Sequence, residues 1–278
     1  MTENSPILSG VIGWPIGHSK SPLIHTHWIK TYGISGHYVP LGIRPENFES
    51  AVRSLPKLGF RGANVTIPYK ENIFSIATSI SDRAALIGAA NTIVFGDDGS
   101  IRADNTDGYG FLENIRSQVP DWRGSNGPAL VLGAGGASRA VVSALLSDGA
   151  PEIRLTNRTR HRADIIKDQF GAKVTVVDWA KASEAVDGAA TIVNTTSLGM
   201  ANNPPLRVKL DRAPAFALVT DIVYTPVDTD FLLQARSFGL RTVDGVGMLL
   251  HQAVPGFEFW FDIRPEVDDH LRQIVLNG

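Results

Sequence analysis

Residues 129–149 read ALVLGAGGASRAVVSALLSDG, an apolar run, a glycine cluster and an amphipathic stretch in direct succession. The apolar run predicts a buried strand, and the stretch after the glycines predicts a helix. Gly133, Gly135 and Gly136 let the backbone turn tightly and approach a pyrophosphate, which the N–H groups at a helix N-terminus then stabilise. A simple tight turn is the alternative. The strand before the glycines and the helix after them favour a dinucleotide-binding loop, with Ser138 where a third glycine is usual.

The end of the next predicted strand, about 20 residues further on, distinguishes the two nicotinamide dinucleotides. An NAD site usually has Asp or Glu there, whereas this chain has Asn157, Arg158, Thr159 and Arg162. A carboxylate would repel a 2′-phosphate, and guanidinium groups bind one through charge-assisted hydrogen bonds. A solvated basic helix start is the alternative, but cations are unfavourable at that end of the helix dipole. The sequence therefore predicts NADP as the cofactor.

The composition is that of an ordinary soluble globular protein, and it excludes several classes of function. Hydrophobic residues make up 43% of the 278 residues and charged residues 19%, which is too apolar for disorder. The formal net charge of −2 gives no reason to expect nucleic acid or an anionic membrane as a partner. The chain has no cysteine, so disulfides and thiolate sites are excluded. We expect no secretory signal, no membrane span and a cytoplasmic location.

Short runs rich in Val and Ile alternate with segments of helical periodicity, which favours βα units and a largely parallel sheet. Residues 120–128, PDWRGSNGP, are dense in Pro, Gly and polar residues and predict a break between two domains. A break at Pro255 is expected in the helical C-terminal segment. Strands are predicted at 7–14, 37–43, 60–67, 129–132, 152–156, 173–177, 190–194, 218–223 and 240–243, a hairpin at 91–104, and helices from Ser21 to Gly33, at 45–59 and at 106–118.

The segment NVTIPYK, residues 64–70, ends a predicted strand and places a lysine two residues after a proline. Pro68 predicts a helix start, with Lys70 in the first turn, where the helix dipole destabilises an ammonium group. Taken alone, Lys70 is more simply a solvated lysine, and Asp107 is a residue in the first turn of helix 106–118. If the two met in one cleft, they would form a proton-transfer pair.

A Gly- and Pro-rich loop, residues 13–22, contains Ser19 and Ser21. Their hydroxyls either cap the following helix or hydrogen-bond a polyol or carboxylate substrate. His18, His25 and His27 do not predict a metal site, because the last two lie on different faces of a helix and no acidic ligand is nearby.

Together these motifs resemble those of the shikimate dehydrogenase family, and the resemblance covers essentially the whole chain in order. The matching segments are GHSKSP (17–22), GANVTIPYK (62–70), GAANT (88–92), DNTDGYGF (104–111), GAGGASRA (133–140), NRTRHRA (157–163), NTTSLGM (194–200), DIVYTPVDTDFL (221–232) and GVGMLLHQA (245–253).

The resemblance implies an α/β fold with an N-terminal open α/β substrate domain, a Rossmann-type NADP domain with a parallel sheet, and a C-terminal helix that returns to the first domain. Residues 1–105 and 246–278 would form the substrate domain, and residues 106–245 the NADP domain. Family members reduce 3-dehydroshikimate to shikimate with NADPH in the synthesis of aromatic amino acids. A homodimer is compatible with the sequence.

The resemblance also implies site residues at matching positions, with Lys70 and Asp107 as the catalytic pair. Pro255 should bend the helix that presents Gln252. The implied substrate-binding residues are Ser19, Ser21, Asn64, Thr66, Lys70, Asn91, Asp107, Tyr224 and Gln252. The implied cofactor-binding residues are Gly133, Ala134, Gly135, Gly136, Ala137, Asn157, Arg158, Thr159, Arg162, Thr195, Ile222 and Gly245.

Three other functions fit part of these observations. A quinate/shikimate dehydrogenase with broader substrate and NAD use is one, although the arginines after the second strand of the dinucleotide domain speak against NAD. A methylenetetrahydrofolate dehydrogenase is disfavoured by the two-serine loop and by DNTDG. A non-catalytic sensor of shikimate-like molecules would have no use for both Lys70 and Asp107.

Overall fold

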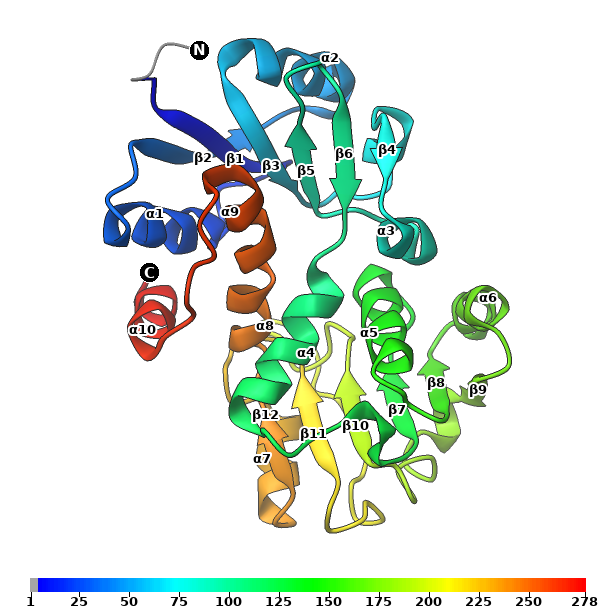
Figure 1. The fold of residues 1–278 in the computed structure, drawn as a ribbon. Coiled ribbons are helices and arrows are strands. Elements are labelled where there is room, and N and C mark those ends of the chain that lie inside the picture. The colour runs from blue at the N-terminus through cyan, green and yellow to red at the C-terminus, as the bar shows by residue number, and fades with distance from the viewer. Residues whose placement is uncertain (1–4) are drawn as a thin grey trace. The chain divides into compact units, whose positions relative to one another are not determined.

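The computed structural model describes residues 5–278, which form two compact units (Figure 1). The first unit ends at Thr106 and is completed by Leu250–Gly278, and the second is Asp107–Leu249. Among residues 5–278, no helix is both long enough and apolar enough to cross a membrane.

The first unit is built on a mixed six-stranded sheet in the order β2-β1-β3-β5-β6-β4. Strands β2, β1 and β3 are parallel, β5 is antiparallel to β3 and β6, and β4 is parallel to β6. The predicted hairpin is confirmed as β5 and β6, joined through a turn in which Gly99 has a φ of 84°. The bounds are β1 (Ile7–Gly13), β2 (Gly36–Gly42), β3 (Phe60–Val65), β4 (Ser79–Ile80), β5 (Thr92–Phe95) and β6 (Ile101–Asp104).

The helices of this unit are α1 (Ser21–Thr31), α2 (Phe48–Ser54), α3 (Asp82–Ile87), α9 (Ala253–Phe261) and α10 (Asp269–Asn277), with 3₁₀ turns η1 (Pro45–Asn47), η2 (Leu55–Leu58) and η3 (Asn72–Ser75). The single helix predicted over 45–59 is wrong, since η1, α2 and η2 replace it. Pro56 lies at the start of η2 and lacks the N–H group that a continuing α-helix would need.

The break expected near Pro255 is confirmed, and it falls at Gln252, between α8 (Val246–His251) and α9. Pro255 is the third residue of α9, where a missing N–H is tolerated, but its ring would clash with the carbonyl of His251 in a continuous helix. Most of α9 is buried, and the helix contacts β1, β3 and β5. Trp260 Nε1 donates to the Ile93 carbonyl of β5 at 3.0 Å.

The second unit is a parallel six-stranded sheet in the order β12-β11-β10-β7-β8-β9 (Figure 1). The chain moves outward from β7 to β9 and then returns to the other side of β7 with β10. This reversal is the doubly wound topology of dinucleotide-binding domains. The strands are β7 (Ala129–Leu132), β8 (Ile153–Asn157), β9 (Val174–Asp178), β10 (Thr191–Asn194), β11 (Leu218–Asp221) and β12 (Arg241–Val243), and the helices are α4 (Asp107–Gln118), α5 (Gly136–Ser147), α6 (Arg160–Phe170) and α7 (Asp230–Ser237), with 3₁₀ turns η4 (Gly124–Asn126) and η5 (Trp179–Lys181).

Both faces of this sheet are covered, which explains its apolar strands. Val131 packs into a core with residues of α4, α5 and α6, whereas Leu130 and Leu132 pack into a second core with residues of α7. The segment 120–128 lies within this unit, between α4 and β7, and not at a division between units as its composition predicted. Helix α4 belongs to the second unit because it packs against α5.

Candidate functional site

The glycine loop after β7 leaves room for a ligand along its backbone. Gly133 has a φ of 114°, and an added Cβ would lie 2.7 Å from Thr195 Oγ1, so this turn requires glycine. At Gly135 and Gly136 an added Cβ would meet no atom within 4 Å. The fold itself does not need glycine at these two positions, whereas a phosphate group lying on their backbone does. This observation fits a pyrophosphate at the N-terminus of α5.

Ser138, where the usual fingerprint has glycine, takes part in holding this loop. It is fully buried, and its Oγ accepts a hydrogen bond from Gly135 N–H at 3.1 Å. The same hydroxyl lies 2.5 Å from Thr195 Oγ1, which in turn donates to the Leu132 carbonyl at 2.7 Å. Thr195 therefore links the glycine loop to the end of β10, a contact that the sequence pattern did not predict.

The basic segment after β8 contains arginines in two different situations. Arg160 forms ion pairs with Asp178 and with Asp164. Arg158 and Arg162 are exposed and have no ion pair within residues 5–278. Asn157 Nδ2 donates to the Thr159 carbonyl at 2.8 Å, which shapes the turn into α6. Two guanidinium groups thus remain for an anionic group, as the NADP prediction requires.

Asp221, at the end of β11, organises the adjoining loops from a fully buried position. Its carboxylate accepts from Val223 N–H at 3.0 Å, Asn194 Nδ2 at 2.9 Å and Thr229 Oγ1 at 2.8 Å. Burial raises the pKa of Asp221, and these three hydrogen bonds offset the rise only in part. This network fixes the backbone on both sides of Ile222.

Gly245 lies against the same stretch of backbone. An added Cβ at Gly245 would be 2.5 Å from the Ile222 carbonyl oxygen, so the close approach requires glycine. Tyr224 is half-buried, and burial raises its pKa. Asp107 is the first residue of α4 and half-buried, a position where the helix dipole favours a carboxylate.

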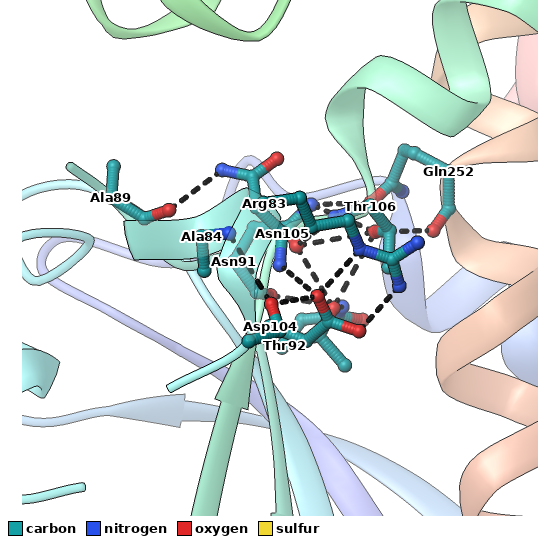
Figure 2. Close-up of polar contacts among 11 residues, drawn as sticks. Arg83, Ala84, Ala89, Asn91, Thr92, Asp104, Asn105, Thr106 and Gln252 are labelled. Carbon is teal, nitrogen blue, oxygen red and sulfur yellow. Dashed lines mark hydrogen bonds and ion pairs between the residues drawn. The ribbon is translucent and has the colours of Figure 1, made fainter. Parts of the chain in front are cut away.

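In the first unit, Asn91 and Gln252 meet in a buried polar network although they lie far apart in the sequence (Figure 2). Asn91 Nδ2 donates to Gln252 Oε1 at 3.4 Å and to Thr106 Oγ1 at 3.0 Å. Asn91 Oδ1 accepts from Thr106 N–H at 2.9 Å. Thr106 Oγ1 also donates to the Gln252 carbonyl at 2.8 Å. Thr106 thus holds together two predicted substrate-binding residues.

Asn64 belongs to the same network. Its Nδ2 donates to the Asn91 carbonyl at 3.1 Å and to Thr92 Oγ1 at 3.2 Å. Its Oδ1 accepts from the Tyr38 hydroxyl at 2.7 Å. Neither Tyr38 nor Thr92 was among the predicted site residues. Their partners lie on other strands, so the local sequence pattern carries no signal of these contacts.

The prediction that a helix begins near Pro68 is wrong. The Ile67–Pro68 peptide is cis, residues 67–68 and 70–71 lie in turns, and η3 starts only at Asn72. Lys70 therefore precedes the nearest helical turn, and the helix-dipole argument for it does not hold. Its backbone carbonyl accepts from Ala90 N–H at 2.8 Å, which ties this segment to residues 88–92.

The serine loop also differs in detail from its prediction. Helix α1 begins at Ser21 itself, with Lys20 at the N-cap position and no side-chain capping bond. Ser19 Oγ accepts from Ser21 N–H at 3.3 Å. Thr66 lies directly after β3, and its N–H donates to the Ile12 carbonyl at 2.9 Å. Within residues 5–278, no cluster of three or more His, Asp or Glu residues is arranged to hold a metal ion.

Family models match along most of the chain. Residues 11–93 match the shikimate dehydrogenase substrate binding domain, residues 115–207 match shikimate / quinate 5-dehydrogenase, and residues 245–273 match the shikimate 5′-dehydrogenase C-terminal domain.

Comparisons with individual proteins agree with these matches. The chain is 59% identical over 269 residues to shikimate dehydrogenase (NADP(+)) of Paracoccus denitrificans, covering 97% of this chain and 95% of the relative. Shikimate 5-dehydrogenase of Thermus thermophilus, solved in complex with NADP(H) and shikimate, has a TM-score of 0.86 at 32% identity, covering 98% of this chain and 99% of that one. Quinate dehydrogenase of Corynebacterium glutamicum, in complex with NAD, has a TM-score of 0.90 at 29% identity, covering 99% and 100%. With this sequence similarity and this fold, the chain belongs to the shikimate dehydrogenase family.

Proposed function

We propose that this chain is an NADP-dependent oxidoreductase that reversibly reduces 3-dehydroshikimate to shikimate in the synthesis of chorismate and the aromatic amino acids. The observation that carries the proposal is the 59% identity to an NADP-dependent shikimate dehydrogenase over 97% of the chain. The open backbone at Gly135 and Gly136 and the arginines beyond β8 support the choice of cofactor.

NADPH, when bound, supplies the hydride that reduces the substrate ketone. The glycine loop would hold its pyrophosphate, and the segment beginning at Asn157 would hold its 2′-phosphate. The loops that Asp221 organises would line the nicotinamide side. The residues assigned to these roles are Gly133, Ala134, Gly135, Gly136 and Ala137 for the pyrophosphate, Asn157, Arg158, Thr159 and Arg162 for the 2′-phosphate, and Thr195, Ile222 and Gly245 for the nicotinamide.

Lys70 and Asp107 carry the proton transfer in this proposal. Reduction of a ketone places negative charge on its oxygen, and a donor must supply a proton to that atom. Lys70 donates this proton in the reductive direction and accepts it in reverse, and Asp107 orients the ammonium group. The proposal rests on the match of both residues to the family motifs, because the helix predicted at Pro68 is not present.

The substrate-binding residues divide by the substrate group that each would recognise. Ser19 and Ser21 bind the carboxylate through their hydroxyls. Amide side chains hydrogen-bond the ring hydroxyls, and such buried polar groups reject analogues that lack a hydroxyl. The residues assigned to the hydroxyls are Asn64, Thr66, Asn91, Asp107 and Gln252, with Tyr224 close by. The hydrogen bonds that join Asn64, Asn91 and Gln252 support this assignment.

The deciding experiment measures turnover of shikimate and quinate with NADP and with NAD, followed by the ultraviolet absorbance of reduced nicotinamide. We expect NADP with shikimate to be the fastest combination. Faster turnover of quinate with NAD would favour the alternative represented by the quinate dehydrogenase neighbour. Binding of shikimate without turnover of any combination would indicate a sensor.

Lys70→Ala tests the acid/base role within the same assay. We expect kcat to fall by about 100-fold or more with little change in the KM for shikimate, as is typical when a general acid is lost. A variant that changes only KM would show that Lys70 binds substrate without transferring a proton.

We further propose a cytoplasmic location and a homodimer for this enzyme. Sedimentation equilibrium measures the oligomeric state, and a monomer at all concentrations would refute the dimer.

A further inference from the structure

Asn64 is an amide whose hydrogen-bonding groups are mostly used within the fold. Both hydrogens of Nδ2 are donated, one to the Asn91 carbonyl and one to Thr92 Oγ1. A carbonyl accepts and never donates, so Nδ2 must face Asn91 and Oδ1 must face the opposite side. On that side Oδ1 accepts from the Tyr38 hydroxyl at 2.7 Å. One lone pair of Oδ1 then remains for another donor.

Tyr38 reaches Asn64 across an intervening strand. It lies on β2 and Asn64 on β3, with β1 between them in the sheet. Ser9, the register partner of Tyr38 on β1, is a small residue. Tyr38 is 5% exposed, and its hydrogen bond to Asn64 is buried.

The ring of Tyr38 is held on one side by His25. The two rings are stacked, with centroids 4.0 Å apart and planes 6° from parallel. His25 is fully buried, and its ring also contacts Trp28, Phe257 and Trp260 at centroid distances of 5.6, 5.9 and 5.6 Å. Neither ring nitrogen has a hydrogen-bond partner.

The charge state of this stack is fixed near neutral pH. Burial lowers the pKa of His25 to about 3, and the neighbouring Asn64 side chain opposes this only in part. Burial also raises the pKa of Tyr38, and the nearby Ser21 side chain offsets part of the rise. A neutral imidazole therefore lies against a neutral phenol whose hydroxyl donates to Asn64.

We propose that Tyr38, packed against His25, is a positioning residue for substrate recognition: its hydroxyl holds Asn64 so that the amide oxygen accepts a hydrogen bond from a substrate hydroxyl. This inference rests on the proposed function, in which Asn64 contacts the substrate. The fold determines which atom of the Asn64 amide is left for the substrate. Both hydrogens of Nδ2 are donated within the fold, so Oδ1 is the atom that can accept a hydrogen bond. The site thus selects a substrate group that donates a hydrogen bond at this point.

Tyr38→Phe tests the proposal by removing one oxygen while keeping the ring. Loss of one hydrogen bond to a substrate-binding group predicts a rise of about 5- to 20-fold in the KM for shikimate. The KM for NADP should stay within about twofold, since a single missing hydroxyl in the first unit alters no group assigned to the cofactor. The calorimetric Kd for shikimate should rise in parallel.

Tyr32→Phe is the matched control. Its hydroxyl accepts from Glu266 N–H at 3.1 Å, and its ring also packs against Phe257. The hydrogen bonds of the Asn64 side chain go to Tyr38, Asn91 and Thr92 instead. We expect it to leave the KM for shikimate unchanged. Thermal unfolding of both variants separates loss of stability from loss of recognition.

Three outcomes would overturn the proposal. They are an unchanged Kd for shikimate in Tyr38→Phe, an equal rise in the KM values for shikimate and NADP, and an equal effect of Tyr32→Phe. Failure of the proposed function is distinguishable, because the wild-type protein would then not turn over shikimate. In that case calorimetry would still test the role of Tyr38, by comparing shikimate binding by wild type and by Tyr38→Phe. If the wild-type protein did not bind shikimate at all, the role of Tyr38 would be refuted as well.

Discussion

Arg83 and Asp104 form a two-point ion pair that joins the start of α3 to the end of β6 (Figure 2). Arg83 Nε donates to Asp104 Oδ1 at 2.6 Å, and a terminal guanidinium nitrogen donates to Oδ2. The Asp104 side chain is 8% exposed, whereas that of Arg83 is 48% exposed. Asp104 also accepts from the Ser81 hydroxyl and from Asn105 N–H. The pair thus fixes the chain two residues before Thr106, which holds Asn91 and Gln252.

Arg83→Met should destabilise the first unit by leaving a buried carboxylate without its cation. We expect a loss of about 2 kcal/mol in the free energy of unfolding at pH 7, below the usual cost of a fully buried pair because Arg83 is half-exposed. Urea unfolding measures this loss. Arg61→Met is the control, since the Arg61–Asp262 pair is exposed on both sides, and we expect a change within about 0.5 kcal/mol.

The effect of Arg83→Met should depend on pH in a defined direction. Burial alone would raise the pKa of Asp104, but the hydrogen bonds from Arg83 and Ser81 outweigh it and leave the pKa below its usual value. A carboxyl group with a lowered folded pKa stabilises the protein above its unfolded pKa of 3.8, and this stabilisation is lost as the pH falls through the folded value. The difference in the free energy of unfolding between wild type and Arg83→Met should therefore shrink as the pH falls below 3.8. If this difference in the free energy of unfolding stayed constant with pH, the ion pair could not be the cause of the destabilisation.

Much of the fold could be predicted from local sequence. The strands of the second unit are confirmed to within one or two residues at each end, because buried parallel strands read as continuous apolar runs. Local patterns failed where the backbone departs from regular helix, at Pro56 and after Pro68. They also missed β4, a two-residue strand that exists only through its pairing with β6.

The hydrogen-bond partners of the candidate substrate-binding residues in the first unit could not be predicted from the sequence. Asn64, Asn91 and Gln252 were predicted by resemblance to family motifs, but their partners Tyr38 and Thr106 were not. Tyr38 bonds to Asn64 across 26 positions of sequence, and Thr106 bonds to Gln252 across 146. Such pairs depend on strand order and on helix packing, and a single sequence carries no local periodicity that reports them.

His25 should make the stability of the protein depend on pH below about 6.5. Its folded pKa of about 3 lies below the ordinary 6.5, so the unfolded chain binds a proton that the folded chain does not. The contribution of neutral His25 to stability is complete at pH values above the unfolded pKa. It is lost as the pH falls towards the folded pKa, by at most about 1.4 kcal/mol per pH unit.

His25→Phe removes this titration while keeping an aromatic ring against Tyr38. Between pH 6.5 and 4.5 we expect wild type to lose about 2 kcal/mol more than the variant. Chemical unfolding at several pH values measures both slopes. Burial also lowers the pKa of His27. His27 is present in both proteins, so its effect on the pH dependence of stability cancels in the comparison. Equal slopes would show that His25 is accessible to protons in the folded state.

Arg158 and Arg160 should differ in their effect on cofactor choice although they lie two residues apart. Arg160 is already paired with Asp178 and Asp164, whereas Arg158 has no ion pair within residues 5–278. Loss of a charge-assisted hydrogen bond to the 2′-phosphate predicts a rise of about 10-fold or more in the KM for NADP in Arg158→Gln. We expect Arg160→Gln to change it by less than about threefold. NAD lacks the 2′-phosphate, so an equal rise in the KM for NAD in Arg158→Gln would contradict the assignment of Arg158 to that phosphate.

Thr229 should stabilise the second unit through a hydroxyl with two roles. Its Oγ1 donates to Asp221 Oδ2 at 2.8 Å and accepts from Leu232 N–H at 3.3 Å, as the N-cap of α7. Thr229→Val keeps the shape but loses both bonds, which predicts a loss of about 2 kcal/mol in the free energy of unfolding. Thr229→Ser keeps the hydroxyl and loses only a buried methyl group, at a cost of about 1 kcal/mol or less. Urea unfolding of the pair distinguishes the two contributions. If serine cost as much as valine, the methyl contacts and not the hydroxyl would account for the stability that Thr229 gives to this loop.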